Sequence, residues 1–356
     1  MSVEVNPSPA ARRVPARLPL LLVGLALADV AGHLLVGGNY GYFRDELYYI
    51  AAGHHLAFGY VDFPPMIALL AALLGRLAGD SLIAIHVVPA LGAGALVIVA
   101  GLIARELGGG RTAMLLAGLA TAVAVVFLAT GSLFSMDVLD EIWWALAAYL
   151  VVRRIRRDEP RTWLWIGLVV GVALATKLTV LFLCFGLVVG LLLTPPRRDL
   201  GTRWPWLAGV LAAAFLAPYV VWNAVNGWPT LDFWLHSGVR GGGGPVSFLA
   251  NQIVALNPLT LPLTVAGLLF YFRAPAGKPY RALGWAFVAT YLLLTVLNGK
   301  PYYFAPAFPM VFAAGGCLLE GIRRRWVLPV YGAALAVSGA LLAPLAMPVL
   351  PPASFV

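Results

Sequence analysis

Residues 82–104 read LIAIHVVPALGAGALVIVAGLIA, a stretch without a single charged side chain. A helix needs roughly 20 mostly apolar residues to cross the hydrocarbon core of a bilayer. Runs of this kind occupy most of the 356 residues, of which 61% are hydrophobic and 11% charged, and the mean hydropathy is +0.89. Soluble domains are about half apolar and a quarter charged. The composition therefore excludes a soluble enzyme, a coiled coil, a disulfide scaffold and a disordered chain, and it predicts an all-α polytopic membrane protein.

The net charge of +9 arises from 24 Lys and Arg residues against 15 Asp and Glu residues. Most of the basic residues gather in short clusters between the apolar runs, the pattern by which cytoplasmic loops orient a membrane protein. The clusters are Arg12, Arg13 and Arg17; Arg105 and Arg111; Arg153, Arg154, Arg156, Arg157 and Arg161; Arg197, Arg198 and Arg203; Arg273, Lys278 and Arg281; and Arg323, Arg324 and Arg325. The charge thus indicates orientation in a membrane, and no nucleic acid is expected as a partner.

If all these clusters are cytoplasmic, an even number of crossings separates each neighbouring pair. Three apolar runs lie between the first two clusters, at residues 18–37, 66–78 and 82–104, so one of them does not cross. The run 66–78 is the shortest and contains Arg76, so it is predicted to be an interfacial or re-entrant helix. About eleven transmembrane helices remain, at residues 18–37, 82–104, 112–130, 137–152, 162–176, 178–194, 204–223, 247–272, 282–297, 303–320 and 326–347.

The predicted organisation is one transmembrane domain, residues 18–347, in the cell (inner or plasma) membrane. A cytoplasmic tail, residues 1–17, precedes it, and a short external tail, residues 348–356, follows without a soluble domain. The large external loop 38–81 carries interfacial helices. A second external loop, residues 224–246, contains a run of four glycines that cannot hold a helix and is expected to be a flexible cover.

The first external loop concentrates polar chemistry. Residues 40–65 hold three carboxylates, two histidines and five tyrosines, among them Asp45, Glu46, His54, Tyr60 and Asp62. External loops without a function are normally short, so a functional role is predicted. The alternative is an aromatic belt with solvated charges at the membrane interface. Asp45 and Glu46 are adjacent and point about 100° apart on a helix, which rules out a close dyad. A carboxylate at a wet–dry boundary is suited to accept a proton from a hydroxyl.

Asp137 opens the predicted span 137–152, where an aspartate serves equally well as a helix cap. A divalent metal ion held by Asp137, a loop carboxylate and a histidine stays an open alternative, which no H-x-x-x-H pattern or cysteine pair supports. No cofactor is otherwise indicated.

Three cations lie outside by the same parity: Lys177, Arg240 and Lys300. Their placement goes against the orientation bias of Lys and Arg, so it predicts an anionic partner at the outer leaflet, with phosphate the natural candidate. The alternative is snorkelling of long side chains at helix ends.

Five motifs together resemble glycosyltransferase family 39, which has the GT-C fold and includes protein O-mannosyltransferases and lipid A aminoarabinose transferases. They are Phe43-Arg44-Asp45-Glu46-Leu47-Tyr48-Tyr49, Gly59-Tyr60-Val61-Asp62-Phe63-Pro64-Pro65, Met136-Asp137, Thr176-Lys177 and Lys300-Pro301-Tyr302-Tyr303. The resemblance implies transfer of a sugar, usually with inversion, from a polyprenyl-phosphate-sugar donor. The acceptor would be a hydroxyl of a protein, lipid or glycan on the external face.

By this resemblance Asp45 is the general base, Glu46 its supporting neighbour and Asp137 the second external acid. The implied donor-phosphate residues are Lys177, Arg240 and Lys300, and the implied wall residues are Tyr60, Asp62, His54, Tyr302 and Tyr303. Two departures stand out. Many relatives carry an arginine where this chain has His86, and many continue into an external soluble domain.

A secondary transporter or lipid flippase is the alternative function, and a non-catalytic membrane scaffold is a third. Transporters bind their substrates near the midplane on broken helices. Here the midplane offers mainly Asp29 and His33, four residues apart on the first predicted span, whereas the acids and the unusual cations fall in external loops. That distribution favours the enzyme.

Overall fold

The computed structural model describes residues 18–79, 81–236 and 244–351, and the regular elements in these ranges are helices. The α-helices are α1 (Leu20–Val36), α2 (Arg44–His54), α3 (Met66–Ala78), α4 (Leu82–Glu106), α5 (Arg111–Ala122), α6 (Val125–Thr130), α7 (Met136–Arg157), α8 (Thr162–Thr176), α9 (Val180–Leu192), α10 (Arg203–Val225), α11 (Pro229–His236), α12 (Gly244–Leu256), α13 (Leu261–Phe272), α14 (Arg281–Val296), α15 (Phe308–Leu319) and α16 (Val327–Leu342). Short 3-10 helices are η1 (Pro195–Gly201), η2 (Pro258–Thr260), η3 (Pro275–Tyr280), η4 (Pro301–Ala307) and η5 (Ala343–Leu345). The predicted tail 1–17, Arg240 and the last five residues of the predicted tail 348–356 lie outside the described residues.

The predicted all-α class is confirmed, and each predicted span falls on a helix or on a pair of helices. Four helices are long and apolar enough to cross a membrane, namely Leu82–Glu106, Arg203–Val225, Pro301–Leu319 and Val327–Leu345, and the number rises to six if each sharply bent helix pair counts as one span. These numbers rest on length and composition within the described residues, so eleven crossings stay a prediction.

Two predicted spans are not continuous helices. The run 247–272 divides into α12 and α13, bent by 96°. Pro258 has no N–H to continue the helix, and Asn257 has a φ of 82° and accepts the Leu259 N–H at 3.1 Å, which caps the next helical segment. The run 112–130 divides at Val123, whose carbonyl accepts from the Asn257 amide at 3.4 Å. One asparagine therefore contacts both breaks.

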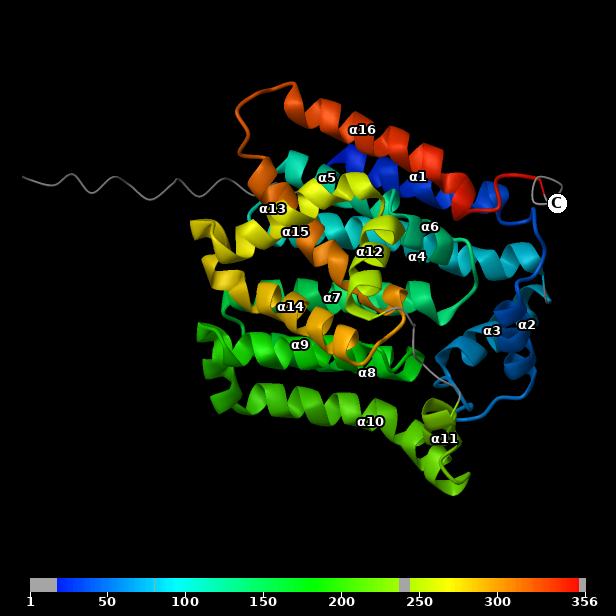
Figure 1. Cartoon of the computed structure of the whole chain (residues 1–356). Coiled ribbons are helices and arrows are strands. Elements are labelled where there is room, and N and C mark those ends of the chain that lie inside the picture. Colours follow the sequence, from blue (N-terminus) through cyan, green and yellow to red (C-terminus); the bar gives the residue numbers. More distant parts are fainter. Residues whose placement is uncertain (1–17, 80, 237–243, 352–356) are drawn as a thin grey trace, which may run out of the picture.

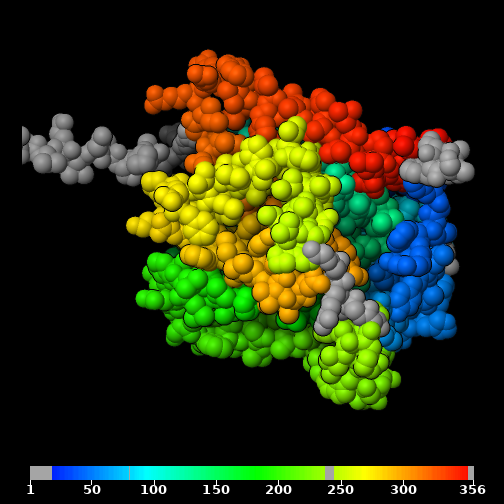
Figure 2. Space-filling view, viewed as in Figure 1, coloured from blue at the N-terminus to red at the C-terminus, as the bar shows by residue number. Residues whose placement is uncertain are grey.

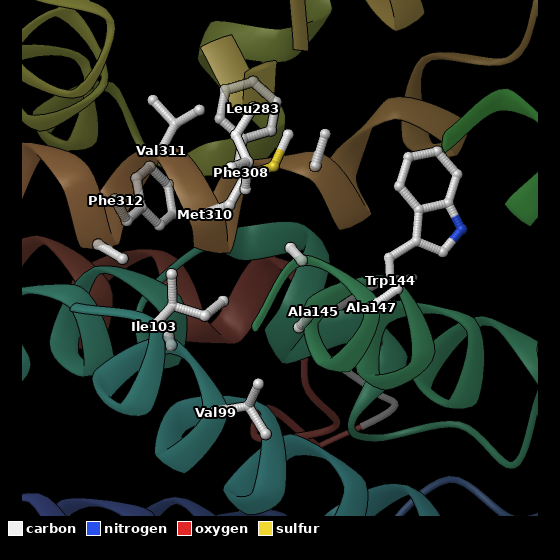
Figure 3. Packing of buried hydrophobic residues seen from close by; sticks show 14 of the residues in the cluster. Val99, Ile103, Trp144, Ala145, Ala147, Leu283, Phe308, Met310, Val311 and Phe312 are labelled. Atoms are coloured by element: carbon white, nitrogen blue, oxygen red, sulfur yellow. The ribbon is translucent and has the colours of Figure 1, made fainter. Parts of the chain in front are cut away.

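The core is an apolar cluster shared by α4, α7, α14 and α15, as Figure 3 shows for Ile103, Trp144, Leu283 and Phe312. Small residues let neighbouring helices approach closely, as is typical of membrane bundles. A Cβ added at Gly186 or Gly190 of α9 would collide with the backbone of α14, whereas one at Gly209 of α10 would meet nothing within 4 Å.

The two ends of the bundle differ in character. Helices α2, α3 and α11 lie together at one end, and the segments 195–203 and 273–281, which hold two of the basic clusters, lie at the other (Figure 1). Figure 2 shows the end of α10 and α11 as a lobe beside α2 and α3. There the Tyr219 and Thr230 hydroxyls donate to the Tyr60 carbonyl at 3.5 and 3.4 Å. The polar residues singled out in the sequence gather at this α2–α3 end.

Candidate active site

The first external loop folds back into a short helix, α2, that places its acids at its N-terminus. The Glu46 side chain accepts the Phe43 N–H at 2.7 Å, satisfying one of the free donors at the start of the helix. Below α2, a small apolar cluster with Tyr49, Phe63 and Phe134 at its centre joins the loop to the bundle. This cluster fixes which face of α2 is buried, and that face includes Glu46.

Glu46 is enclosed, with 1% of its surface exposed. Besides Phe43, its carboxylate accepts the Phe134 N–H at 2.7 Å and faces Nε2 of His86 at 2.8 Å. Its contacts are therefore with three separate segments of the chain. In this position Glu46 joins α2, α4 and the turn that precedes α7.

Asp45 points away from this junction, and 41% of its side chain is exposed. Arg44 donates to it at 2.8 Å from a side chain that is itself largely in solvent. The Asp45 side chain lines a cavity of about 340 Å³, here called the acidic cavity, together with Asp137 and Tyr302. Its other lining residues are Phe43, Glu46, Val126, Ala129, Thr130, Leu133, Phe134 and Ser135. The structure thus brings the three acids predicted to be catalytic, Asp45, Glu46 and Asp137, to one cavity, although Asp45 and Asp137 lie 92 positions apart in the sequence.

Asp137 lies in the first turn of α7, with Ser135 as the N-cap: the Asp137 N–H donates to the Ser135 hydroxyl at 3.2 Å. The Asp137 carboxylate forms an ion pair with Lys177, which follows α8 and is 7% exposed. The ammonium of Lys177 also lies over the rings of Tyr302 and Tyr303, 5.2 and 4.9 Å from their centroids. Burial alone would lower the pKa of Lys177, but the charges of Asp137 and Asp140 outweigh it and raise the pKa above its usual value. Lys177 is therefore a buried, charged group at neutral pH.

Asp140 and Glu141 lie one turn further along α7 and are buried. The Thr179 hydroxyl donates to Asp140 at 2.6 Å, and the Trp144 indole donates to it at 3.0 Å. Glu141 accepts from the Thr130 hydroxyl at 3.0 Å. Of these two acids, Asp140 acts with Asp137 on the charge of Lys177.

A second cavity of about 470 Å³, here called the apolar cavity, lies on the other side of Lys177. Lys177, Asp62 and Tyr303 are its polar lining, and the rest is mainly hydrophobic: Pro64, Met136, Leu178, Thr179, Leu181, Phe182, Trp234, Leu294, Leu297 and Gly299. Asp62 accepts from the Tyr48 hydroxyl at 2.9 Å, which joins this wall to α2. The pair formed by Asp137 and Lys177 therefore stands between the two cavities, with Asp137 on the acidic and Lys177 on the apolar side.

Other residues implied by the resemblance lie at a distance from these cavities or face away from them. The Tyr60 hydroxyl donates to the carbonyls of Ala52 and His55 at 2.9 and 3.0 Å, which secures the end of α2, and burial raises its pKa. His54 is exposed at the end of α2 and lines neither cavity. Lys300 is partly exposed beside Gly299 of the apolar cavity.

The sequence assigned no site role to His86, Thr179, Phe182 and Trp234, which the structure places at the site. The last three are single residues in apolar or aromatic runs, with no local signal to mark them. His86 stood out only as a departure from its relatives, because its partner Glu46 lies 40 residues earlier. Within the described residues no group of three or more His, Cys, Asp or Glu side chains is placed to hold a metal ion. Asp137 is instead paired with Lys177, so these side chains do not fit the metal site considered above.

Comparison with known proteins identifies a shared architecture. A family model described as dolichyl-phosphate-mannose-protein mannosyltransferase matches residues 62–222. The lipid A galacturonosyltransferase RgtD of Rhizobium johnstonii is 28% identical over 271 residues, which cover 72% of this chain and 55% of that protein. The chain thus spans about half the length of this relative.

Among solved structures, that of ArnT from Cupriavidus metallidurans bound to undecaprenyl phosphate superposes with a TM-score of 0.70 at 21% identity. The match covers 91% of this chain and 64% of that one. The oligosaccharyltransferase of Archaeoglobus fulgidus matches with a TM-score of 0.55 at 14% identity, over 90% of this chain and 55% of that one. These likenesses confirm the GT-C fold and the resemblance to glycosyltransferase family 39 that the sequence motifs indicate.

Proposed function

We propose that this chain is a membrane glycosyltransferase that moves a sugar from a polyprenyl-phosphate-sugar donor to a hydroxyl acceptor on the external face. The observation that carries the proposal is the position of the Asp137–Lys177 pair between the apolar and the acidic cavity. A transferase with a lipid-borne sugar donor needs an apolar space for the polyprenyl chain, a cation for the phosphate and, next to the sugar, an acid that can accept a proton. The apolar cavity, Lys177 and the acidic cavity occur here in that order.

The apolar cavity suits the lipid end of the donor. Its wall is built from Leu181, Phe182, Leu294 and similar side chains, and the ammonium of Lys177 reaches its edge. A solved relative of the same fold holds undecaprenyl phosphate, a lipid of the class proposed. Donor binding would then exchange the Asp137 carboxylate for a phosphate oxygen as a partner of Lys177, assisted by Lys300 and Arg240 from the predicted set. Asp62 and Tyr303 would form the polar edge where the sugar begins.

Asp45 is the proposed general base. Its exposed carboxylate would accept the proton of the acceptor hydroxyl while the hydroxyl oxygen attacks the anomeric carbon from the face opposite the phosphate. The bond from this carbon to the phosphate oxygen breaks, and the polyprenyl phosphate leaves with the electron pair. Its negative charge develops beside Lys177, a cation held in place before the reaction. A single displacement of this kind inverts the anomeric centre.

The acceptor would enter from the acidic cavity, which Asp45 lines. RgtD acts on lipid A, and a lipid hydroxyl at the outer rim is accordingly the acceptor to test first, with protein and glycan hydroxyls after it.

The roles of Tyr60 and Glu46 are to hold α2, since their polar atoms contact the chain itself.

A transporter or flippase remains the alternative. Its charges would be expected deep in the bundle, where Asp29 and His33 lie 3.8 Å apart. The larger group of acids, with Lys177, lies at the α2–α3 end. Movement of labelled lipid across vesicles by the purified protein, without any sugar transfer, would favour this alternative.

The decisive test is transfer of a labelled sugar from a polyprenyl-phosphate donor by the protein in membranes, comparing wild type with Asp45→Asn. The variant keeps the size and loses the base, so turnover should fall by at least about 100-fold, while donor binding, measured separately, survives. Asp232→Asn is the matched control, because Asp232 is an exposed aspartate on α11 that pairs with His236. Wild-type turnover in Asp45→Asn would remove the proposed base.

A further inference from the structure

A third cavity, here called the rim cavity, adjoins the acidic cavity on the side away from Lys177. It measures about 420 Å³ and shares Phe43 and Leu133 with the acidic cavity. The remaining lining residues are Gly37, Tyr40, Gly41, Tyr42, His86, Ser132, Pro344, Leu345, Ala346, Met347, Pro348 and Leu350. His86 is its buried polar residue nearest to the acids, and the mechanism proposed above does not use it.

Both nitrogens of the His86 ring face acceptors. Nδ1 lies 2.5 Å from the Gly37 carbonyl oxygen and Nε2 lies 2.8 Å from a Glu46 carboxylate oxygen. A carbonyl oxygen can only accept, so Nδ1 carries a proton. The Glu46 carboxylate also accepts two backbone N–H groups, from Phe43 and Phe134, so the ring of His86 shares this carboxylate with the start of α2 and with the turn before α7.

The two bonds join the two ends of one segment. Gly37 follows α1 and Glu46 lies in the first turn of α2, so the single ring on α4 holds residues 37–46 at both ends. Asp45 is the neighbour of Glu46, and its ion pair is with Arg44, whose side chain is largely in solvent. The fit around the ring is close: a Cβ added at Gly37 would lie 3.1 Å from Nδ1. The position of Asp45 therefore depends on this ring more than on contacts of its own.

We infer that His86 is a positioning residue of the proposed transferase, whose ring fastens the first external loop through Gly37 and Glu46 and so holds Asp45 at the acidic cavity. The inference rests on the proposed function. Loss of either contact would release one of the two ends, and turnover would fall for a reason separate from the base itself.

In the described part of the chain, Glu46 is the acid that contacts the His86 ring. Tyr40 and Tyr42 line the same cavity. On α1, His33 lies one turn before Gly37, and its Nδ1 donates to the Ser132 hydroxyl at 2.9 Å. His33 is thus a second buried histidine close by that makes no contact with Glu46.

Two neutral variants separate the two bonds. His86→Asn places an amide N–H near the former Nδ1 and keeps the contact to Gly37, whereas His86→Gln places one near the former Nε2 and keeps the contact to Glu46. Each should lower kcat by about 10- to 100-fold, as expected for a small displacement of a catalytic group, while the donor KM changes less than about twofold. His86→Arg has several N–H donors and can contact Gly37 and Glu46 at once, so it should retain more activity than the neutral variants.

The split between kcat and KM is the readout that a merely structural histidine would not give. In the neutral His86 variants kcat per folded molecule should fall while the donor KM stays close to that of wild type. His33→Gln, the control, should leave both constants unchanged per folded molecule. A wild-type kcat in both neutral variants, or an effect on the donor KM alone, would overturn the inference.

A measurement without turnover separates this inference from the proposed function. Ser132→Cys is almost isosteric, and residue 132 is 4% exposed in the turn that Glu46 holds through Phe134. Labelling of this cysteine by a maleimide should be slow and should speed up several-fold when His86→Asn, which loses the contact to Glu46, is added. If this occurs in a protein that transfers no sugar, the positioning role stands and the proposed function fails. Equal labelling rates in both proteins would contradict the positioning role.

Discussion

Lys177 shows how a buried positive charge, which is unfavourable in a membrane protein, can be stabilised by its neighbours. A charged side chain buried at the edge of a bundle loses its hydration. Here the loss is offset by the ion pair with Asp137 and by the rings of Tyr302 and Tyr303. Such an arrangement keeps a positive charge facing the apolar cavity, where an anionic lipid headgroup would arrive. In the proposed reaction, Lys177 would exchange one anion, Asp137, for another, the donor phosphate.

Replacement of Lys177 by alanine should weaken donor binding. A hydrogen bond to a charged group contributes about 1.5–3 kcal/mol, so the donor Kd should rise roughly 10- to 100-fold. Because Lys177→Ala leaves Asp137 unpaired, the double variant Lys177→Ala with Asp137→Asn distinguishes a folding defect from a binding defect: its fold should recover and its donor binding should not. Lys278→Ala, on the exposed η3 segment, is the control. Donor affinity equal to wild type in Lys177→Ala would exclude the phosphate contact.

The same residues show what a sequence can predict of a site. Asp45, Asp137 and Lys177 were identifiable because each is a charge in a chain with few charges, placed next to apolar runs. Their mutual contacts were not, since the pairing of Lys177 with Asp137 joins positions 40 apart through the packing of α7 and α8. Glu46 is a charge in the same loop, yet its carboxylate accepts backbone N–H groups and faces His86. Residue type was enough to single out the candidate residues, whereas the tertiary structure determined which atoms each of them contacts.

At the scale of helices, close approach depends on glycine. Helices α9 and α14 pack through Gly186 and Gly190, whose hydrogen atoms face the α14 backbone. Long apolar runs predicted the helices themselves, because any uninterrupted run of this length forms a helix to satisfy its backbone in lipid. The breaks at Val123 and Asn257 were not predicted. The second depends on a proline that the sequence shows and the first on a contact from a residue 134 positions away.

Gly190→Ala and Gly209→Ala form a matched pair that tests this packing. The added methyl group at Gly190 would meet the carbonyl of Ala282, and overpacking of this kind costs about 1–3 kcal/mol. At Gly209 the methyl group meets nothing within 4 Å, and alanine is the better helix former. Thermal unfolding of the purified protein in detergent should give a lower Tm for Gly190→Ala and an unchanged or slightly higher Tm for Gly209→Ala. Equal Tm values would show that α9 and α14 can separate without cost.

The whole molecule is a bundle with two different ends, and the proposed function needs each end on its own side of the membrane. Acids, aromatic residues and the three cavities gather at the α2–α3 end, whereas η1 and η3 carry basic residues at the other. A transferase with a lipid-phosphate donor is confined to the side from which its donor's sugar projects. The orientation of the bundle therefore decides which pool of donors and acceptors the acidic cavity can reach.

Single cysteines at the two ends test this orientation. Leu47 of α2 is 54% exposed and the Arg198 side chain of η1 is 75% exposed, so either substitution leaves the packed core untouched. Because basic loops stay in the cytoplasm, a membrane-impermeant maleimide added to intact cells should label Leu47→Cys and should label Arg198→Cys only after permeabilisation. The parent chain supplies the background from Cys184 and Cys317, which are both partly buried. The opposite labelling pattern would place Asp45 and Lys177 in the cytoplasm, where an externally displayed sugar could not reach them, and the proposed reaction would lose its donor.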